Sequence, residues 1–504
     1  MQNKAYPYYD ILIAGAGFAG SLTALILHNL GFKVCLLERG KHPRFIIGES
    51  STPIADMILR DLSRKYNLTW LSDFSRYGSW QRAHPEIVCG IKRGFSFFKH
   101  YPGRKFSTNR EHCNELLVAA SNEDALSDTN WLREDFDAFL VNKVKEAGID
   151  YYDLAEIASA TKEKLWKFHV SRMQMDLDIE TSFFIDATGS GGLLYRLLGM
   201  VSSSQGMLTD SFAMYSHFRQ VLPWKDKLQL DGISTEDFPY NPDNSALHHI
   251  LDEGWLWMLR FNDLRTSLGF VIDGSNPLHK GFTAERAWEE LVRKYPSIED
   301  VLKDTKMVSP PGQIIMTGRL QRKITCCFGS GWVALPNTAG FIDPLFSSGI
   351  AHTLSGVERV IAMVNQHWAN ESLLLPHLKE YDQAVLEELK FLDYLVAGCY
   401  KTMAYFELFS TWSMFYFATA IAHERRRTSQ SSTGYFLNAD DMDFREAVQV
   451  SFRDLLKITH QKRPTRKDIR WFTSLVKERI EPFNTAGLME PDARNMYRHT
   501  VTTE

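Results

Sequence analysis

The hydrophobic positions at the start of the chain follow two different periods. Residues 10–14 form a short apolar run typical of a buried parallel strand, and residues 21–30 have the spacing of a helix. A second apolar run over residues 32–38 ends in an acid. The order of strand, glycine-rich turn, helix and strand predicts a βαβ unit that opens the fold.

Further along, the pattern predicts more strands and then a helical region. Residues 182–189 form another buried-type strand that ends in a turn. Strand-like patches at 212–219, 255–261 and 267–273 indicate a separate sheet. The last part of the chain changes to long helical periods, such as residues 384–404. Because strands and helices alternate before that point, we expect the α/β class.

An aromatic-rich helix is predicted within the C-terminal region. Its aromatic residues share helical spacing: Phe406, Phe409, Trp412, Phe415 and Tyr416. They either pack over an aromatic ligand or form part of the core, and core is the more common outcome. The polar run at 425–434 that follows is predicted to be an exposed loop.

Length and composition exclude several classes of protein. A chain of 504 residues predicts about two to four domains. Its net charge of −4 gives no electrostatic reason to expect nucleic acid or an anionic membrane as a partner. Six cysteines without a CxxC pair predict reduced thiols. No signal peptide is predicted, and the apolar stretch near 411–422 is shorter than the roughly 18 residues of a membrane span, so we expect a cytoplasmic enzyme.

The glycine motif Gly15-x-Gly17-x-x-Gly20 stands in the context that a dinucleotide site requires. It follows a strand, opens a helix and is followed by Glu38 at the end of the next strand. The turn brings backbone amides and the positive end of the helix to a pyrophosphate. Glu38 can accept hydrogen bonds from ribose hydroxyls, which disfavours a 2′-phosphate and therefore NADP.

Three further segments favour FAD over NAD by resemblance to flavoproteins. Ile185-Asp-Ala-Thr-Gly189 resembles the second nucleotide-contact strand of two-domain flavoproteins. Arg133 lies in a segment that resembles the one near the FAD phosphates in aromatic hydroxylases and halogenases. Gly48-Glu49-Ser50-Ser51-x-Pro53 resembles the loop that lies against the flavin in halogenases and related reductases, although Glu49 could instead serve only as a charge at a helix N-terminus.

Residues 8 to 365 as a whole resemble the flavin-dependent halogenases of the phenol- and pyrrole-directed branch. Asp343-Pro-Leu-Phe-Ser-Ser-Gly349 is similar to their halide-binding segment, which implies that the amides of Ser348 and Gly349 hold chloride or bromide. Hydroxylases carry related sequences here, so the segment also fits plain flavin contact. Phe346 replaces the glutamate of the tryptophan-directed enzymes, which makes free tryptophan an unexpected substrate.

Two more motifs carry the resemblance. Trp255 and Trp257 resemble the tryptophan pair that shields the flavin from organic substrate, although Leu259-Arg260 replaces the Ile-Pro that follows this pair in the family. Phe346 is assigned to the same wall. Lys92 would be the lysine that accepts hypohalous acid and delivers the halogen; this requires a neutral amine and hence burial. The alternative for the two tryptophans is a plain stripe of core residues, and the alternative for Lys92 is a lysine on the surface. Arg93 could itself be the residue that faces the site.

The resemblance implies a set of FAD-contacting residues and a domain plan. The FAD contacts are Gly15, Gly17, Ala19, Gly20, Glu38, Arg39, Glu49, Ser50, Arg133, Asp186, Gly189, Asp343, Pro344, Gly349 and Ile350. The fold is a Rossmann-like FAD domain of the aromatic hydroxylase type over 8–205 and 324–375, with a substrate-side β segment near 77–110. A β-sheet substrate domain over 206–323 and a helical region over 376–504 complete it.

The implied activity is halogenation of a phenol or pyrrole with reduced FAD, oxygen and halide. The ring would be free or tethered to a carrier protein, and a separate flavin reductase would supply the reduced FAD. Asn337 stands where related flavoproteins have an aspartate, which predicts weak flavin binding, and no metal motif is present. An aromatic hydroxylase, an isoprenoid-type flavin reductase and a non-catalytic flavoprotein that binds a partner remain alternatives.

Overall fold

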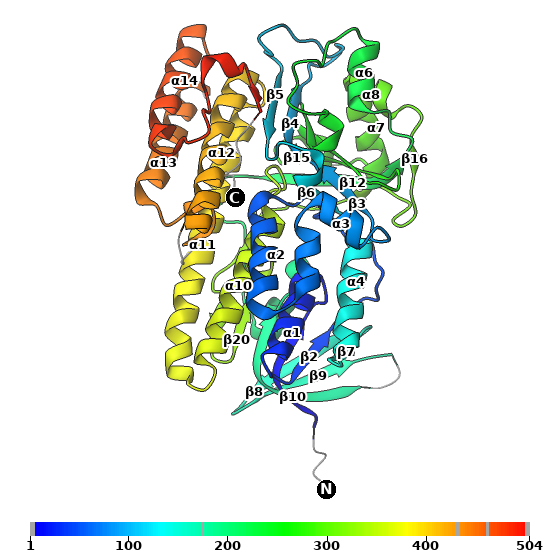
Figure 1. Cartoon of the computed structure of the whole chain (residues 1–504), viewed down its shortest axis with the longest axis vertical. Helices are drawn as coiled ribbons and strands as arrows, with labels where there is room; N and C mark the ends of the chain where they lie inside the picture. Colours follow the sequence, from blue (N-terminus) through cyan, green and yellow to red (C-terminus); the bar gives the residue numbers. More distant parts are fainter. Residues whose placement is uncertain (1–5, 174–175, 280, 430–433, 460–462, 499–504) are drawn as a thin grey trace.

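The computed structural model describes residues 6–173, 176–279, 281–429, 434–459 and 463–498. Figure 1 shows one sheet in the lower half of the molecule, a second in the upper half, and long helices along one side of both. The α/β class is confirmed, because parallel strands with crossover helices form the lower half. Among the described helices, none is long and apolar enough to cross a membrane.

The first sheet is mostly parallel. Its main path contains, in spatial order, β19 (Phe328–Gly329), β20 (Trp332–Ala334), β10 (Leu177–Asp186), β1 (Tyr8–Ala14), β2 (Val34–Leu37) and β7 (Asp150–Tyr152). An antiparallel extension adds β8 (Glu156–Lys162) and β9 (Trp166–Ser171). Every residue of β2 is buried, as expected for a strand covered on both faces.

The register of the parallel strands brings their carboxyl ends to one edge. Ala14 pairs with both Leu37 and Asp186, and Asp186 pairs with Ala334. The loops that begin at Gly15, Glu38 and Leu335 therefore leave the sheet side by side. Open α/β sheets bind ligands at this edge, where the strand order reverses.

Four helices cover the first sheet and lead to the upper half. They are α1 (Phe18–Asn29), α2 (Pro53–Tyr66), α4 (Arg133–Glu146) and α10 (Ser348–His367). Helix α1 packs against α4 and α10, and α10 packs against α2. Helix α2 begins at Pro53, where the sequence predicts a helix start, because proline favours the first turn.

The second sheet is mixed and draws on distant parts of the chain. Its order is β16 (Lys306–Met307), β12 (Ser211–Arg219), β15 (Thr266–Asp273), β14 (Gly254–Arg260), β13 (Ala246–Ile250), β4 (Gly94–Lys99), β5 (Glu115–Ala119) and β22 (Met496–Tyr497), and β17 (Ile315–Met316) pairs with β12. The strands expected at 212–219, 255–261 and 267–273 are confirmed as β12, β14 and β15. Strand β22 lies close to the C-terminal end and had no sequence signal.

Smaller elements connect and cover the two sheets. Short strands form two more sheets: β3 (Cys89–Lys92) with β6 (Asp128–Trp131), and β11 (Ser202–Ser203) with β18 (Arg322–Ile324) and β21 (Gly340–Phe341). The remaining short helices are α3 (Tyr77–Ala83), α5 (Leu193–Leu198), α6 (Trp224–Leu230), α7 (Ala284–Lys294), α8 (Pro296–Leu302) and α9 (Pro336–Ala339).

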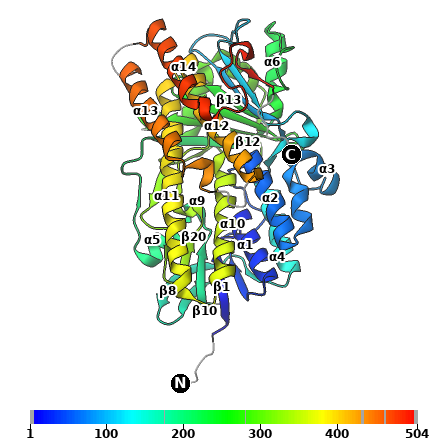
Figure 2. The same cartoon turned by 60° about the vertical axis from the view of Figure 1, so that its left-hand side comes forward.

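The C-terminal region forms a group of long helices. These are α11 (Glu371–Thr402), α12 (Phe406–Ser429), α13 (Met442–Thr459) and α14 (Arg466–Ile480). Both views show α11 beside the first sheet and α12 beside the second (Figures 1 and 2). Helix α12 continues through Ser429, so the loop expected to begin at residue 425 starts later, and residues 430–433 lie outside the described part. The domain boundaries themselves stay a prediction.

Candidate functional site

The glycine turn after β1 has the shape that a bound pyrophosphate requires. Gly15 has a φ of +98°, and a Cβ there would lie 2.6 Å from the carbonyl oxygen of Ala187. A Cβ on Gly20 would lie 1.9 Å from the carbonyl oxygen of Gly15. Gly17 caps α1 without a side-chain hydrogen bond to the helix amides. The first amides of α1 are therefore left for a ligand.

Glu38 is fixed at the end of β2. Its carboxylate accepts hydrogen bonds from the amides of Ala16 (2.9 Å) and Gly40 (2.8 Å). Burial opposes ionisation, but the Arg44 guanidinium and these two amides outweigh it and lower the pKa of Glu38. Glu38 is therefore a charged acceptor beside the glycine turn, whereas Arg39 is exposed.

Arg133 lies on the other side of the same turn. Its guanidinium donates to both carboxylate oxygens of Asp137 (2.9 and 2.8 Å) and to the carbonyl oxygen of Gly48 (3.0 Å). One of its nitrogens would be 3.5 Å from a Cβ on Gly17. The structure thus brings together Gly17, Gly48 and Arg133, which are far apart in sequence.

The loop that contains Glu49 lies against the second sheet. Glu49 is buried, and its Oε1 is 2.8 Å from Nε2 of His217 on β12. Its Oε2 has no hydrogen-bond partner among the described residues. Ser50 bridges to Asn130 of β6. Glu49 therefore does more than place a charge near a helix, because it joins the two halves of the molecule.

Asp186 closes the first sheet at its ligand edge. It accepts hydrogen bonds from the amide (2.9 Å) and hydroxyl (2.6 Å) of Thr188, and burial raises its pKa to about 6. Gly189 follows directly, and its amide donates to the Thr338 hydroxyl at 3.0 Å. The Asn337 amide nitrogen would be 3.0 Å from a Cβ on Gly189. Asn337, which stands where related flavoproteins have an aspartate, thus lies over this loop.

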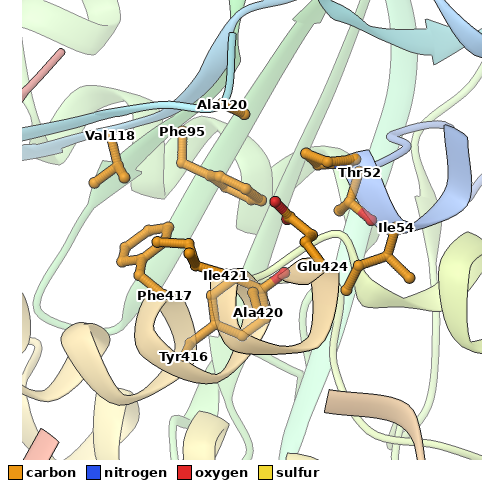
Figure 3. Close-up of a pocket in the computed structure, with 11 residues that line it drawn as sticks. Thr52, Ile54, Phe95, Val118, Ala120, Tyr416, Phe417, Ala420, Ile421 and Glu424 are labelled. Carbon is orange, nitrogen blue, oxygen red and sulfur yellow. The ribbon is translucent and has the colours of Figure 1, made fainter. Parts of the chain in front are cut away.

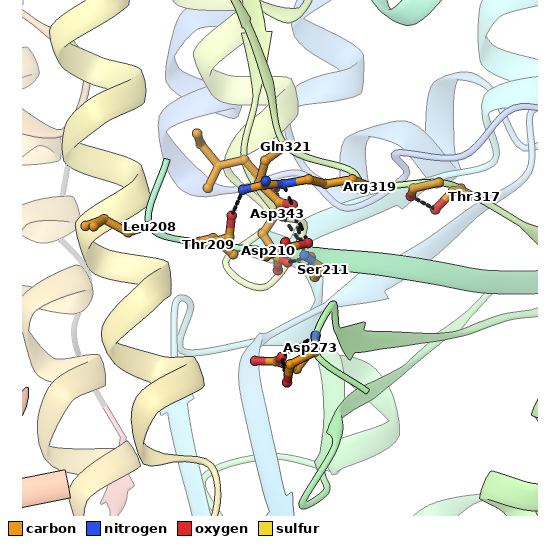
Figure 4. Close-up of polar contacts among 12 residues, drawn as sticks. Leu208, Thr209, Asp210, Ser211, Asp273, Thr317, Arg319, Gln321 and Asp343 are labelled. Atoms are coloured by element: carbon orange, nitrogen blue, oxygen red, sulfur yellow. Dashed lines mark hydrogen bonds and ion pairs between the residues drawn. The ribbon is translucent and has the colours of Figure 1, made fainter. Parts of the chain in front are cut away.

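Asp343 anchors the segment that leads into α10. Its carboxylate accepts from the hydroxyls of Ser211 and Tyr400, both at 2.8 Å, and from the amide of Leu345 at 3.1 Å. Gln321 donates to the Ser211 hydroxyl and to the Ile342 carbonyl oxygen. Figure 4 shows Asp343 beside Ser211 and Gln321 in this network. These contacts fix the backbone of the segment.

The N-terminus of α10 offers two backbone amides. Ser347 has a φ of +52°, in the left-handed region, and its amide donates to the Pro344 carbonyl oxygen. Ser348 and Gly349 are the first two residues of the helix, so the helix itself provides no acceptor for their amides. Unpaired amides at a helix N-terminus attract anions. The geometry therefore supports the predicted halide position.

The two tryptophans of β14 form a buried aromatic wall. Trp255 and Trp257 point to the same face, with ring centroids 6.0 Å apart. Trp255 donates to the Tyr400 hydroxyl at 3.3 Å, and Trp257 donates to the Ser267 hydroxyl at 3.1 Å. Through Tyr400 the wall is tied to the Asp343 segment.

Arg260, where the related enzymes have proline, faces away from this wall. Its guanidinium donates to Asp243 (2.7 Å) and to the carbonyl oxygens of Val221 and Leu222. Alternation along β14 puts Arg260 on the face opposite the tryptophans. The departure from the family motif therefore leaves the wall unchanged.

Phe346 links the α10 segment to α12. Its ring stacks on Tyr416 with centroids 4.1 Å apart, and its carbonyl oxygen accepts from the Tyr416 hydroxyl at 3.0 Å. On α12, Tyr416 also lines a pocket (Figure 3). The segment predicted to hold halide is thus joined to this pocket by the Phe346–Tyr416 ring pair.

Lys92 is completely buried, with 0% of its side chain exposed. Its Nζ donates to the Ser51 carbonyl oxygen (2.5 Å), lies 3.8 Å from Asp128, and stands 4.1 Å from the centre of the Phe95 ring. Burial lowers the pKa of Lys92, against the opposing charges of Asp128 and Asp56. The alternative of a surface lysine does not hold.

Arg93 points elsewhere. Its guanidinium pairs with Asp124 at 2.6 Å and donates to the Ser121 carbonyl oxygen. Arg93 lies between β3 and β4, and its partners Asp124 and Ser121 differ from those of Lys92. Of the two neighbouring cations, Lys92 is the one that faces the interior.

Phe95, the ring next to the Lys92 amine, also lines a pocket. Four elements line it: Thr52, Pro53 and Ile54 at the start of α2; Phe95 from β4; Val118 and Ala120 at the end of β5; and Tyr416, Phe417, Ala420, Ile421 and Glu424 from α12. Figure 3 shows the Glu424 side chain reaching from α12 toward Phe95. The pocket is apolar and aromatic apart from Thr52, the Tyr416 hydroxyl and Glu424.

Sequence comparison then defines the family. A sequence model of the tryptophan halogenase family matches residues 131–407, which is more than half of the chain. The chain belongs to the tryptophan halogenase family. The expectation of a flavin-dependent halogenase that uses FAD and halide is thereby confirmed, and the role of Lys92 stays a prediction.

Named relatives of this halogenase act on several kinds of ring. The monodechloroaminopyrrolnitrin halogenase PrnC of Pseudomonas fluorescens is 25% identical over 451 residues, covering 84% of this chain and 75% of that protein. A chlorinase of 1H-pyrrole-2-carbonyl groups on a peptidyl-carrier protein, from Pseudomonas fluorescens strain Pf-5, is 25% identical over 353 residues, covering 69% and 73%.

Solved structures share the fold over the full length. The crystal structure of halogenase PltM with phloroglucinol and FAD has a TM-score of 0.87 and 23% identity, covering 98% of this chain and 100% of that one. The helical C-terminal region of this halogenase is therefore part of the shared fold.

The residues present in this halogenase fit FAD. The glycine turn has no room for side chains at Gly15 and Gly20, and Gly17 leaves the amides of α1 unpaired. Glu38 and Arg133 flank the turn with opposite charges, suited to ribose hydroxyls and phosphate respectively.

Sequence reasoning missed Glu424 and the acids beside Lys92. Asp56 and Asp128 share a hydrogen bond, and burial raises the pKa of both. The signal for Glu424 was available, because it follows Tyr416, Phe417, Ala420 and Ile421 at helical spacing. The polar run from residue 425 onward was interpreted as a loop, and Glu424, directly before it, was therefore not assigned to the helix face.

Proposed function

We propose that this halogenase chlorinates or brominates a small electron-rich ring, a phenol or a pyrrole, in the pocket beside Phe95, with Lys92 as the residue that delivers the halogen. One observation carries the proposal: Lys92 is a fully buried amine whose Nζ lies 4.1 Å from a ring that forms the pocket wall. Such an amine, with its pKa lowered by burial, can be neutral and nucleophilic.

The residues divide between two sites. Gly15, Gly17, Gly20, Glu38 and Arg133 would hold FAD, together with the ligand edge of the first sheet. When bound and reduced, FAD supplies the oxidation of halide by oxygen to hypohalous acid.

The halide would lie on the amides of Ser348 and Gly349 at the start of α10. The tryptophan wall, held by Tyr400 and Ser267, keeps the organic ring away from the oxidation site. Hypohalous acid then reaches Lys92, where the halogen passes to nitrogen and water leaves. Separation by the wall directs the oxidant to halide instead of the ring.

The ring would bind between Phe95 and Tyr416, because aromatic walls favour a flat apolar ligand. Phe346 stands where tryptophan-directed enzymes have a glutamate, and its ring contacts Tyr416 and Phe417. A ring that is already electron-rich needs no such polarising carboxylate. A carrier-bound ring is the second candidate, favoured by the carrier-bound substrate in the name of one relative. Reduced FAD would come from a separate reductase.

Product mass spectrometry tests the proposal. Purified protein would be supplied with FAD, a flavin reductase, NADH, oxygen and bromide, and offered phenols and pyrroles, free and carrier-bound. We expect a brominated product with wild-type protein and its loss with Lys92→Met. Products that gain one oxygen instead, independent of bromide and of Lys92, would contradict the proposal and favour a hydroxylase.

A further inference from the structure

Glu424 occupies an unusual place for a carboxylic acid. It is 6% exposed, and among the described residues that line the pocket it is the only carboxyl group. Its side chain reaches toward Phe95 (Figure 3), and the Lys92 Nζ lies 4.1 Å from the centre of the same Phe95 ring. A buried acid without an ion-pair partner is costly to a fold, so its presence in an apolar pocket calls for a reason.

The geometry of α12 gives that acid a fixed direction. Tyr416, Phe417, Ala420, Ile421 and Glu424 follow the spacing of one helix face, and all five line the pocket. Because this helix is buried over nearly its whole length, the face cannot rotate away. Glu424 is therefore presented to any ring that lies on Phe95 and Tyr416.

The charged groups around Glu424 come from three elements. Asp128 on β6 repels its ionised form, whereas Lys92 on β3 and Arg425 on α12 favour it. Burial is the largest effect, and together they raise the pKa of Glu424 to about 8. Burial also raises the pKa of the Tyr416 hydroxyl, which already donates to the Phe346 carbonyl oxygen. Glu424 is thus the pocket group suited to exchange a proton near neutral pH.

We propose that Glu424 is a catalytic acid–base residue that binds the hydroxyl of a phenol substrate, removes its proton as the ring takes up the halogen, and passes that proton to the Lys92 nitrogen. This inference rests on the proposed function, in which Lys92 carries the halogen. It adds a substrate requirement: the activating group of the ring must bear a proton.

The atoms of the cycle balance. In the first step, neutral Lys92 and hypohalous acid form an N–halogen bond, break the O–halogen bond and release water. In the second, the ring carbon bonds to the halogen as the N–halogen bond breaks. The phenol proton moves to the Glu424 carboxylate and then to the Lys92 nitrogen, which restores both side chains. The ring keeps its hydroxyl by moving a proton from carbon to oxygen, and the halogen is reduced as the ring is oxidised.

The test compares Glu424→Gln with a matched variant on the same helix. Glutamine keeps the shape of the side chain but cannot take a proton. Glu407→Gln is the control, because Glu407 is an exposed partner of Arg466 at the start of α12. Each protein would be assayed with bromide on a phenol and on its methyl ether, over a range of pH, and hypobromous acid would be measured in parallel with a chemical trap.

We expect Glu424→Gln to lower kcat on the phenol by about 100-fold with little change in KM. Wild-type activity should rise with pH up to about 8, as Glu424 ionises, and this rise should disappear in Glu424→Gln. Trapped hypobromous acid should be unchanged, and the methyl ether should react equally with both proteins. Glu407→Gln should match wild type throughout.

Other results overturn the inference. One is phenol halogenation by Glu424→Gln within about threefold of wild type, with the same pH profile. Another is loss of hypobromous acid itself, since the defect would then lie in halide oxidation. If wild-type protein halogenates no ring, the proposed function fails by itself. The inference about Glu424 is then decided by the affinities of wild type and Glu424→Gln for the phenol and for its methyl ether. Tighter binding of the phenol than of its ether by wild type, with no such difference in Glu424→Gln, supports the inference. Equal affinities of wild type for the two compounds overturn it.

Discussion

Replacement of Glu424 by glutamine should stabilise the protein at high pH while it removes activity. Glu424 is buried, and its pKa rises from about 4.5 to about 8 on folding. The folded state therefore holds a proton that the unfolded state has already released at neutral pH. Ionisation of Glu424 in the folded state is unfavourable, and glutamine avoids it.

The size and sign follow from linkage. Between about pH 4.5 and pH 8 the folded protein binds more protons at this site than the unfolded chain, so the free energy of unfolding falls as the pH rises. Each pKa unit corresponds to about 1.36 kcal/mol, which gives about 5 kcal/mol over the whole window. Between about pH 6 and pH 9, Glu424→Gln should gain about 3 kcal/mol relative to wild type.

Urea unfolding of wild type, Glu424→Gln and Glu407→Gln at these two pH values measures the difference directly. The comparison between variants cancels the titration of all other groups. A stability difference between Glu424→Gln and wild type that is the same at both pH values would refute the reasoning, because it would mean that Glu424 titrates normally. The exposed Glu407 should show no pH-dependent gain.

Three further variants test other parts of the site. Gly20→Ala should abolish FAD binding, measured by flavin fluorescence, because its Cβ would lie 1.9 Å from a backbone oxygen; Gly318→Ala, with open space around it, should not. Gly349→Pro removes one amide at the start of α10, where proline is tolerated, and should raise the bromide concentration for half-maximal product formation at least about tenfold. Arg359→Met leaves the buried Glu388 carboxylate without its bidentate partner and should lower the free energy of unfolding by about 3–5 kcal/mol in urea; a loss below about 1 kcal/mol would contradict this.

The first sheet and its ligand edge were predictable from local sequence. The glycine turn and Glu38 have fixed spacing on adjacent elements, so their meaning does not depend on distant parts of the chain. Lys92 and the Trp255–Trp257 pair were found through family resemblance, and period-2 alternation along β14 explains why the tryptophans point inward while Arg260 does not.

The pocket could not be predicted in the same way. It brings the start of α2, strand β4 and helix α12 together from three distant parts of the sequence. The aromatic positions of α12 were expected to be core or ligand-facing, and both occur: Trp412 packs in the core, whereas Tyr416 lines the pocket. The helix also runs on to Ser429, beyond the point where the arginine run suggested a loop, because Arg426 and Arg427 have acidic partners.

The fate of hypobromous acid in Lys92→Met tests the central claim most directly. Lys99→Met is the matched control, since Lys99 is another fully buried lysine, on β4, the next strand along the chain, and is held by Asp252 at 2.6 Å. With a phenol substrate we expect Lys92→Met to form as much trappable hypobromous acid as wild type but no brominated product, and Lys99→Met to keep both. Full bromination by Lys92→Met would show that the halogen reaches the ring without Lys92.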